Sequence, residues 1–308
     1  MESNVHPDLL VGLAHGDDAA VWRRSGGRAL VATVDFFTPI VDDAATWGRI
    51  GAANSASDVY AMGGEPMFAL NVVAWPKDTL PVSLLGDVLA GASEVAREGG
   101  WIIAGGHTVD GPEPMFGQVV IGEVDERDLL TNVGARPGDW LVLTKPLGTG
   151  VIATAHKRLA HDDATLAPSL AAAIASMTTL NNVAAAQARH ARASACTDVT
   201  GFGLAGHLHK MLLGSGVAAE VNMAAIPLLP GTLDLIAEGF VPGGTHRNLE
   251  WVNDFLVDAT GLDRLILADP QTSGGLLFTC AEPPDGATVI GRIVPGTAGT
   301  IVVRDNLS

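Results

Sequence analysis

Aspartates stand at four places in the sequence where a regular element is predicted to begin or end. Asp17 and Asp18 precede a predicted strand, and Asp35 closes another. Asp58 lies near the end of a predicted helix, and Asp198 lies in the segment 197–203, after a predicted buried strand. Clustered carboxylates repel unless cations neutralise them, and Mg²⁺ takes one or two carboxylates together with phosphate oxygens. As a set the aspartates indicate a magnesium–phosphate site, although each read alone favours an ordinary exposed side chain.

The spacing of Asn54 and Asp58 singles out one of these places. The two residues are four apart, so a helix carries both side chains on one face. Asp58 also lies near the C-terminal end of that helix, where the helix dipole disfavours an anion. A bound cation would remove this conflict.

Four glycine-rich segments could bring backbone N–H groups close to a phosphate. They are residues 104–111 with His107, 143–150 with Lys145, 242–248, and 269–275. None is a Walker A loop or a dinucleotide fingerprint. Each read alone is at least as well explained as a structural turn, and Lys145 equally well as a surface lysine.

Composition limits the partners and the chemistry. The 308 residues are 47% hydrophobic and carry a net charge of −16, which argues against binding nucleic acid. Only four lysines occur, so a lysine-built phosphate cradle is not expected. Cys196 and Cys280 are predicted to be inert thiols in buried strands. No secretory signal precedes residue 8 and no stretch reaches the ~20 apolar residues of a membrane span, so we expect a cytoplasmic protein.

Strand and helix signals alternate in the first half of the chain. Strands are predicted at residues 28–35, 67–75, 101–104 and 116–124, with helices at 43–62 and 82–97. A glycine- and proline-rich loop is predicted between the last two strands. Both helices end at glycine pairs, which commonly terminate helices.

A polar connector at residues 126–138 precedes a second set of elements. Helices are predicted at 150–159, 166–188 and 203–213, and strands at 140–144, 218–222, 276–280, 287–293 and 300–304. The pattern predicts two α+β domains, residues 1–130 and 131–308.

The order of the motifs is more specific than any one of them. The segments are 17–21 (DDAAV), 34–42 (VDFFTPIVD), 54–64 (NSASDVYAMGG), 105–108 (GGHT), 143–148 (LTKPLG), 197–203 (TDVTGFG), 242–245 (PGGT) and 269–275 (DPQTSGG). This series resembles the selenophosphate synthetase (selenide, water dikinase) family, part of the PurM-like group of ATP-binding enzymes, across nearly the whole chain.

The resemblance implies a fold and a reaction. It implies two α+β domains, with the N-terminal domains of two subunits pairing into a β-barrel and the ATP sites near that interface. The implied reaction converts ATP, selenide and water into selenophosphate, phosphate and AMP with the help of Mg²⁺. The implied partners are therefore ATP, selenide and a second copy of the chain, with no nucleic acid and no membrane.

The resemblance also implies site residues. The implied Mg²⁺ ligands are Asp18, Asp58 and Asp198. The implied nucleotide-contacting residues are His15, Gly16, Asp17, Asp35, Asn54, Asp58, Gly106, His107 and Thr108. Several Mg²⁺ ions would bridge the aspartates and the triphosphate and neutralise developing charge.

One family feature has no counterpart here. Members usually carry a glycine-rich segment with a cysteine or selenocysteine and a lysine before the first aspartate motif. Residues 1–16 contain neither cysteine nor lysine, and neither Cys196 nor Cys280 matches that position, so no catalytic nucleophile is identified. Two alternatives stay open: another PurM-like enzyme such as thiamine-monophosphate kinase, and a non-catalytic nucleotide-binding relative.

Overall fold

A computed structural model describes residues 6–13, 16–159 and 164–305. The chain divides into two compact units. The N-terminal unit comprises Met1–Leu129 together with Met177–Asn182, and the C-terminal unit comprises Leu130–Ser176 and Val183–Ser308. The N-terminal unit is therefore discontinuous in sequence.

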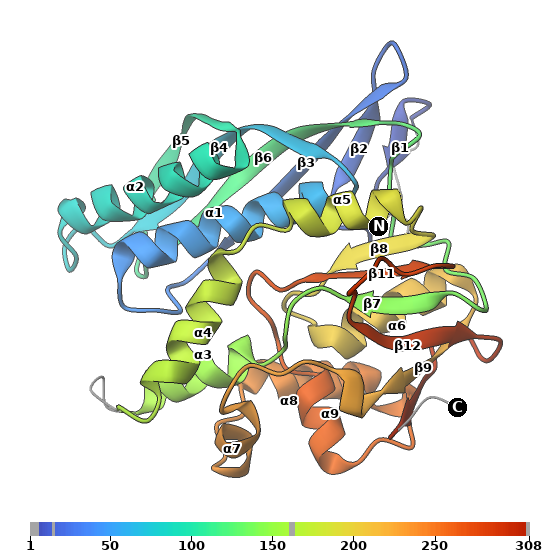
Figure 1. Cartoon of the computed structure of the whole chain (residues 1–308). Coiled ribbons are helices and arrows are strands. Elements are labelled where there is room, and N and C mark those ends of the chain that lie inside the picture. Colours follow the sequence, from blue (N-terminus) through green and yellow to red (C-terminus); the bar gives the residue numbers. More distant parts are fainter. Residues whose placement is uncertain (1–5, 14–15, 160–163, 306–308) are drawn as a thin grey trace. The chain divides into compact units, whose positions relative to one another are not determined.

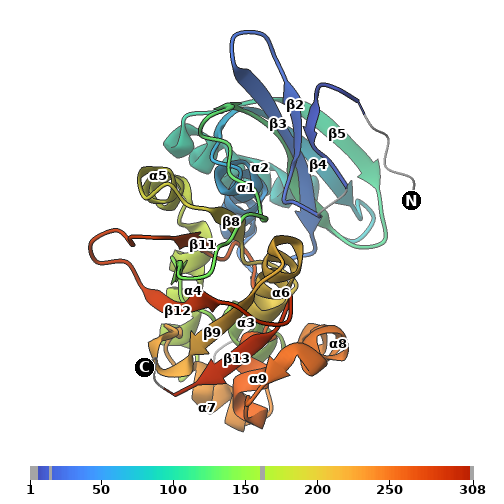
Figure 2. The ribbon, with the colours of Figure 1, turned by 90° about the vertical axis from the view of Figure 1, so that its right-hand side faces the viewer.

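The described part of the N-terminal unit is built on a six-stranded sheet with α1 and α2 on one face (Figures 1 and 2). In spatial order the strands are β1 (Leu9–Val11), β2 (Ala20–Arg23), β3 (Arg28–Phe37), β6 (Met115–Asp125), β4 (Glu65–Trp75) and β5 (Ile102–Asp110). Neighbouring strands are antiparallel except β4 and β5, which α2 connects as a parallel pair.

The two helices of this unit pack at very short range. They are α1 (Ala44–Ala61) and α2 (Val82–Gly99). A Cβ atom at Gly48 would lie 1.9 Å from the carbonyl oxygen of Val88, and one at Gly91 would lie 2.0 Å from that of Ala45. Glycine thus lets the backbones touch, and α1, buried between α2 and the sheet, is held firmly.

The described part of the C-terminal unit contains a seven-stranded sheet and helices α3 to α9 (Figure 1). In spatial order the strands are β10 (Leu256–Val257), β13 (Ile301–Arg304), β9 (Ala218–Asn222), β12 (Val289–Val294), β7 (Trp140–Leu143), β11 (Leu276–Cys280) and β8 (Ala195–Asp198). The α-helices are α3 (Thr149–Arg158), α4 (Ala167–Thr178), α5 (Asn182–His190), α6 (Gly203–Ser215), α7 (Thr232–Ala237), α8 (Gly243–Val252) and α9 (Gly261–Leu267), and two 3₁₀ turns are η1 (Met223–Ala225) and η2 (Asn253–Phe255). Strands β7 and β8 both pair antiparallel with β11, so their C-terminal ends lie at the same edge of the sheet.

Two predicted elements were wrong in extent. The predicted strand 101–104 continues as β5 to Asp110, where a loop was expected. Glycine makes this possible, because a Cβ at Gly106 would lie 2.3 Å from the carbonyl oxygen of Asn71 in β4. The predicted helix 166–188 is two helices, because α4 ends at Thr178 and α5 begins at Asn182, within the segment Met177–Asn182 that belongs to the N-terminal unit.

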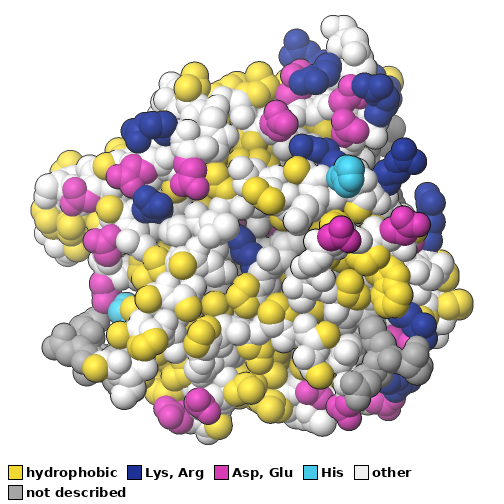
Figure 3. Space-filling model, viewed as in Figure 1, with side chains coloured by type: hydrophobic (Ala, Val, Ile, Leu, Met, Phe, Trp, Pro, Cys, Tyr) yellow, Lys and Arg dark blue, Asp and Glu magenta, His cyan; other side chains and the backbone are white. Residues whose placement is uncertain are grey.

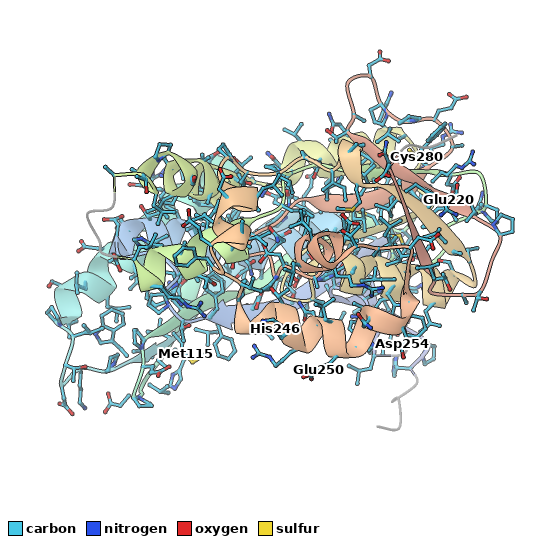
Figure 4. The ribbon with its side chains drawn as sticks, turned by 90° about the horizontal axis from the view of Figure 1, so that it is seen from below. Met115, Glu220, His246, Glu250, Asp254 and Cys280 are labelled. Carbon is cyan, nitrogen blue, oxygen red and sulfur yellow. The ribbon has the colours of Figure 1, made fainter. Side chains whose placement is uncertain are left out.

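The segment 242–248 is also corrected, from a glycine turn to the start of a helix. Pro242 precedes the first turn of α8, which begins at Gly243. His246 and Glu250 point outward from α8, and Asp254 lies just beyond its end (Figure 4). The basic side chain of His246 is therefore exposed on a helix surface and does not line a loop.

Charges of both signs intermix on the N-terminal unit near the turn between β2 and β3 (Figure 3). Arg23 pairs with Glu126 at 3.3 Å, and Arg28 pairs with Glu123 at 2.5 Å. Basic side chains here face acidic ones and do not form a basic surface. Among the described residues, no helix is both long and apolar enough to cross a membrane.

Candidate active site

Asp35 and Asn54 meet where β3 faces α1. The side-chain amide of Asn54 donates a hydrogen bond to Oδ2 of Asp35. The hydroxyl of Ser55 bonds the carbonyl oxygens of Asp35 and Gly51 at 3.0 and 2.9 Å, and accepts the N–H of Gln118 at 3.1 Å. This buried serine fixes α1 against β3, which carries Asp35, and against the neighbouring strand β6.

Asp58 joins the same group one helical turn later. Its Oδ2 accepts a hydrogen bond from the hydroxyl of Thr33. Thr33 and Asp35 are two apart on β3, and Asn54 and Asp58 are four apart on α1, so all four side chains occupy the surface between strand and helix. The structure thus brings Asp35, Asn54 and Asp58 together, as the spacing of the helical pair predicted.

The environment of Asp35 favours a bound cation. Burial raises the pKa of its carboxyl, while hydrogen bonds from Asn54 and from the backbone N–H of Phe36 lower it. The net shift of the pKa is upward, so burial disfavours the ionised carboxylate. A divalent cation beside it would favour the ionised form.

The acidic pair Asp17 and Asp18 lies just before β2, the strand that pairs with β3. Asp17 and Asp18 are half-buried, and one carboxylate oxygen of Asp18 is shielded from solvent. Ala20 pairs with Ala32 of β3, so the register directs the chain before it toward the part of β3 that carries Asp35. Gly16 is exposed, and His15 lies outside the described residues.

A polar row crosses the N-terminal sheet at the level of Asp35. In register, Asp35 pairs with Gln118 of β6, Gln118 with Asn71 of β4, and Asn71 with Gly106 of β5. Gln118 is fully buried and donates from Nε2 to Oδ1 of Asn71 at 2.9 Å. Its Oε1 has no hydrogen-bond partner among the described residues. Sequence analysis missed this row, and its only local signal is two amides inside otherwise apolar strands.

Gly106, His107 and Thr108 are exposed on β5, at the edge of the sheet. Two strands, β6 and β4, separate β5 from β3. At the usual strand spacing, Gly106 therefore lies about 14 Å from Asp35. The structure does not bring this predicted nucleotide-contacting segment together with the aspartates of the same sheet.

Asp198 belongs to the C-terminal unit, at the end of β8. It is 1% exposed and lies close enough to Lys145 for its charge to act on that lysine. Burial lowers the pKa of Lys145 to about 7, and Asp198 opposes the shift. The ammonium group donates to the carbonyl oxygen of Ser273 at 2.9 Å. Lys145 is thus a buried lysine and not a surface one.

The segments 143–150 and 269–275 bind each other. Oε1 of Gln271 accepts the N–H groups of Gly148 and Thr149 at 3.1 and 3.2 Å and the hydroxyl of Thr149 at 3.0 Å. Nε2 of Gln271 donates to Oδ2 of Asp269 at 2.8 Å. Gly148 has no side chain to cap α3, so Gln271 supplies the cap from a distant part of the chain.

Asp269 lies beside this cap in the core. Its carboxyl is 1% exposed, and its Oδ2 accepts the hydrogen bond from Gln271, whereas its Oδ1 is buried with no hydrogen-bond partner among the described residues. Burial raises its pKa to about 7, and the hydrogen bond from Gln271 opposes the shift. The contacts of Gln271 therefore support the structural interpretation of these two segments as a helix cap, in which one oxygen of Asp269 takes no part.

The histidines and cysteines of the C-terminal unit are also engaged in its core. Nε2 of His207 accepts the N–H of Thr200 at 3.1 Å, and burial lowers the pKa of His207 to about 3. Nδ1 of His209 bonds the carbonyl oxygen of Gly299 at 2.9 Å. Cys196 and Cys280 are free thiols and buried, and burial raises the pKa of Cys280 to about 11.

The fit of Mg²⁺ rests on the donors between β3 and α1. Among the described residues, no group of three or more His, Cys, Asp or Glu side chains could hold a metal ion alone. Asp35 and Asp58 offer two carboxylates, and the groups that bond them are the amide of Asn54 and the hydroxyl of Thr33. Mg²⁺ typically takes one or two protein carboxylates and completes its shell with phosphate and water, so these residues fit it as a partner of a phosphate ligand.

Comparison with protein families matches both units. Residues 16–124 match the AIR synthase related protein, N-terminal domain, and residues 136–304 match the C-terminal domain of the same family. Over 285 residues the chain is 44% identical to a selenide, water dikinase from Shewanella sp. (strain ANA-3), covering 92% of this chain and 79% of that protein. The chain belongs to the selenide, water dikinase family.

A second member of the dikinase family gives the same picture. The selenide, water dikinase of Shewanella sp. (strain W3-18-1) is 46% identical over 284 residues, with 92% of this chain and 79% of that protein covered. Among solved structures, thiamine monophosphate kinase from Aquifex aeolicus aligns with a TM-score of 0.70 at 19% identity, covering 94% of this chain and 92% of that chain. This likeness shows that the chain shares the two-domain α+β fold of that kinase.

Proposed function

We propose that this chain synthesises selenophosphate from ATP, selenide and water, releasing AMP and phosphate. Identity of 44–46% to selenide, water dikinases over 92% of the chain supports the reaction. The observation that carries it within the structure is the meeting of Asp35, Asn54 and Asp58 between β3 and α1. Both phosphoanhydride bonds of ATP break: one phosphoryl group goes to selenide and the other to water.

In this proposal the residues between β3 and α1 bind and orient the triphosphate. Asp58, Asp18 and Asp198 are the proposed Mg²⁺ ligands, and Asp35 and Asp58 lie at the junction of metal and nucleotide. When bound, Mg²⁺ would neutralise charge on the phosphate oxygens. Asn54 and Thr33 hold the two carboxylates in place by direct hydrogen bonds, so little reorganisation is needed when the nucleotide arrives.

His15, Gly16 and Asp17 are proposed to contact the nucleotide before the first metal aspartate. Gly106, His107 and Thr108 are proposed to contact it from β5. We assign no catalytic nucleophile, since Cys196 and Cys280 are buried and the reactive form of a cysteine is the exposed thiolate. Two free buried thiols also agree with the reducing cytoplasm as the proposed location.

A homodimer is proposed from the sheet face opposite α1 and α2. In strand register, Val34 and Phe36 of β3, Leu70 of β4 and Val109 of β5 point to that face. Val34 is 57% exposed and Val109 48% exposed. An apolar sheet face of this kind is typical of a protein interface. Pairing two such sheets would form the proposed β-barrel.

The strand order separates two groups of proposed nucleotide contacts. Within one sheet, the contacts on β5 lie about 14 Å from Asp35, with two strands between. Asp35 faces α1, whereas the proposed dimer face is the opposite face of the sheet. We propose that the ATP sites lie near the interface between the two copies.

The test is AMP release from Mg-ATP, measured with and without selenide under anaerobic conditions. Selenide-dependent AMP together with one equivalent of phosphate is expected. ADP as the only product, or AMP release indifferent to selenide, would contradict the proposed reaction. Sedimentation of the wild type and of Val34→Asp tests the dimer, because a buried unpaired carboxylate should convert dimer to monomer.

A further inference from the structure

The segment Met177–Asn182, which we name the clip, belongs to the N-terminal unit and includes the end of α4 and the first residue of α5. Most of α4, which leads into it, and of α5, which follows it, lies in the C-terminal unit. The chain therefore leaves one unit, contributes six consecutive residues to the other, and returns. Such an excursion costs backbone entropy, and contacts made by the clip must compensate for it.

The clip reaches α1 through Asn181. Its side-chain amide donates to the hydroxyl of Ser57 at 2.9 Å. Asn181 is 2% exposed and Ser57 is fully buried, so water does not reach this hydrogen bond. If the bond is lost, a polar group is left buried and unsatisfied, which is costly. Ser57 directly precedes Asp58. The clip thus holds α1 at the residue next to the proposed metal ligand.

The clip reaches the neighbouring helix through Leu180. A Cβ at Gly99, the last residue of α2, would lie 3.0 Å from Cδ1 of Leu180 and 2.0 Å from Cζ3 of Trp101. Leu180 and Trp101 are both buried, at 6% and 3% exposure. The apolar contact at the end of α2 and the polar contact to α1 are made by adjacent residues, so the clip is anchored on both helices.

Asn181 contacts α1 near its C-terminal end, next to Asp58. Asp58 lies four residues before the C-terminal cap, Met62, in the last turn of the helix. Last turns fray more easily than helix interiors, and α1 carries no basic residue there to stabilise it. Thr33 holds Asp58 from the strand side, and Asn181 holds the preceding residue from a different direction.

We propose that Asn181 is a positioning residue that keeps the last turn of α1, and with it Asp58, in the geometry that binds Mg-ATP. This inference rests on the proposed function. It gives the junction between α4 and α5 a role in the reaction, and it makes residues 177–182 part of the nucleotide site's support. A displacement of about 1 Å at a charged ligand is enough to cost a large factor in turnover.

The decisive variant is Asn181→Ala in the full chain. We expect the Mg²⁺ concentration for half-maximal ATP binding to rise about tenfold, as for other residues that support a metal ligand. In the nucleotide-free protein, the amides of the last turn of α1 should exchange hydrogen faster than in the wild type. Ser57→Ala should act similarly, and the double variant should be no worse than either single one, because one shared bond is lost.

Val95→Ala is the matched control, since it truncates a buried side chain of α2 and leaves the bond from Asn181 to Ser57 intact. It should lower the melting temperature without changing the Mg²⁺ requirement. An Asn181→Ala protein that binds Mg-ATP like the wild type would overturn the positioning role alone, as would an equal shift in Val95→Ala. A wild type that binds no Mg-ATP would overturn the proposed function and the inference with it.

Discussion

Two groups of polar residues, one in each unit, look alike in the sequence and differ in the structure. Side-chain hydrogen bonds from Asn54 to Asp35 and from Thr33 to Asp58 join a half-buried strand to a helix. In the C-terminal unit, Asp269 and Gln271 are almost fully buried, and Oε1 of Gln271 accepts backbone N–H groups at the start of α3. We propose that the first group binds a ligand, whereas Gln271 of the second group caps a helix.

The difference teaches how to interpret an aspartate beside glycines. Glycine permits a close backbone approach, and that approach can admit a phosphate or another part of the same chain. At residues 269–275 the approaching group is the N-terminus of α3, which has no cap of its own. Glycine alone therefore does not tell a binding site from a helix cap. The group that approaches the glycine-rich segment decides between the two.

Asp58→Ala is the strongest way to break this comparison. Loss of a proposed metal ligand should lower Mg-dependent ATP binding and AMP release by about a hundredfold or more, while the fold persists. Titration calorimetry with Mg-ATP and an AMP assay measure the effect. Asp87→Ala, at an exposed acid of α2, is the control and should behave like the wild type. Unchanged affinity in Asp58→Ala would refute the metal assignment.

Gln271→Ala addresses the other side of the comparison. It removes the acceptor for two backbone N–H groups and a hydroxyl, so the free energy of unfolding should fall by about 2–4 kcal/mol. Urea denaturation measures the loss, with exposed Gln187→Ala as control. The Mg²⁺ dependence of ATP binding should stay unchanged. A large shift in that dependence with little loss of stability would show that Gln271 belongs to a ligand site.

The pH dependence of stability sharpens the assignment of Asp269. Its folded-state pKa of about 7 lies above the ordinary value, so the buried carboxyl favours folding while it is protonated. This contribution is complete below about pH 4 and is lost as the pH rises to about 7. Urea midpoints of the wild type should fall across that window relative to those of Asp269→Asn. Parallel curves for the two proteins would contradict a neutral buried carboxyl.

Cys280→Ala should have the smallest effect. The buried thiol holds its proton, so turnover should stay within about twofold of the wild type. Loss of one buried sulfur should cost about 1 kcal/mol of stability. A steady-state AMP assay compares the two proteins. A severe loss of turnover at preserved stability would mean that the C-terminal unit supplies reactive chemistry after all.

Local patterns in the sequence were sufficient for the helix that carries the site. The predicted helix 43–62 agrees with α1, and the four-residue spacing placed Asn54 and Asp58 on one face. The polar row of Asp35, Gln118 and Asn71 could not be predicted, because it depends on the register of three strands distant in sequence. The cap of α3 was missed for the same reason, since Gln271 lies far along the chain from Gly148.

The clip has a consequence for the way this protein is made. Synthesis runs from the N-terminus, and domains generally fold as they emerge. The N-terminal unit has its six described strands, α1 and α2 once Leu129 has been made, but it lacks Leu180 and Asn181 until β7, α3 and α4 have been translated. Until then the end of α2 and the buried hydroxyl of Ser57 lack their final contacts. The N-terminal unit therefore cannot complete its packing during synthesis until the clip, which is translated after part of the C-terminal unit, is available.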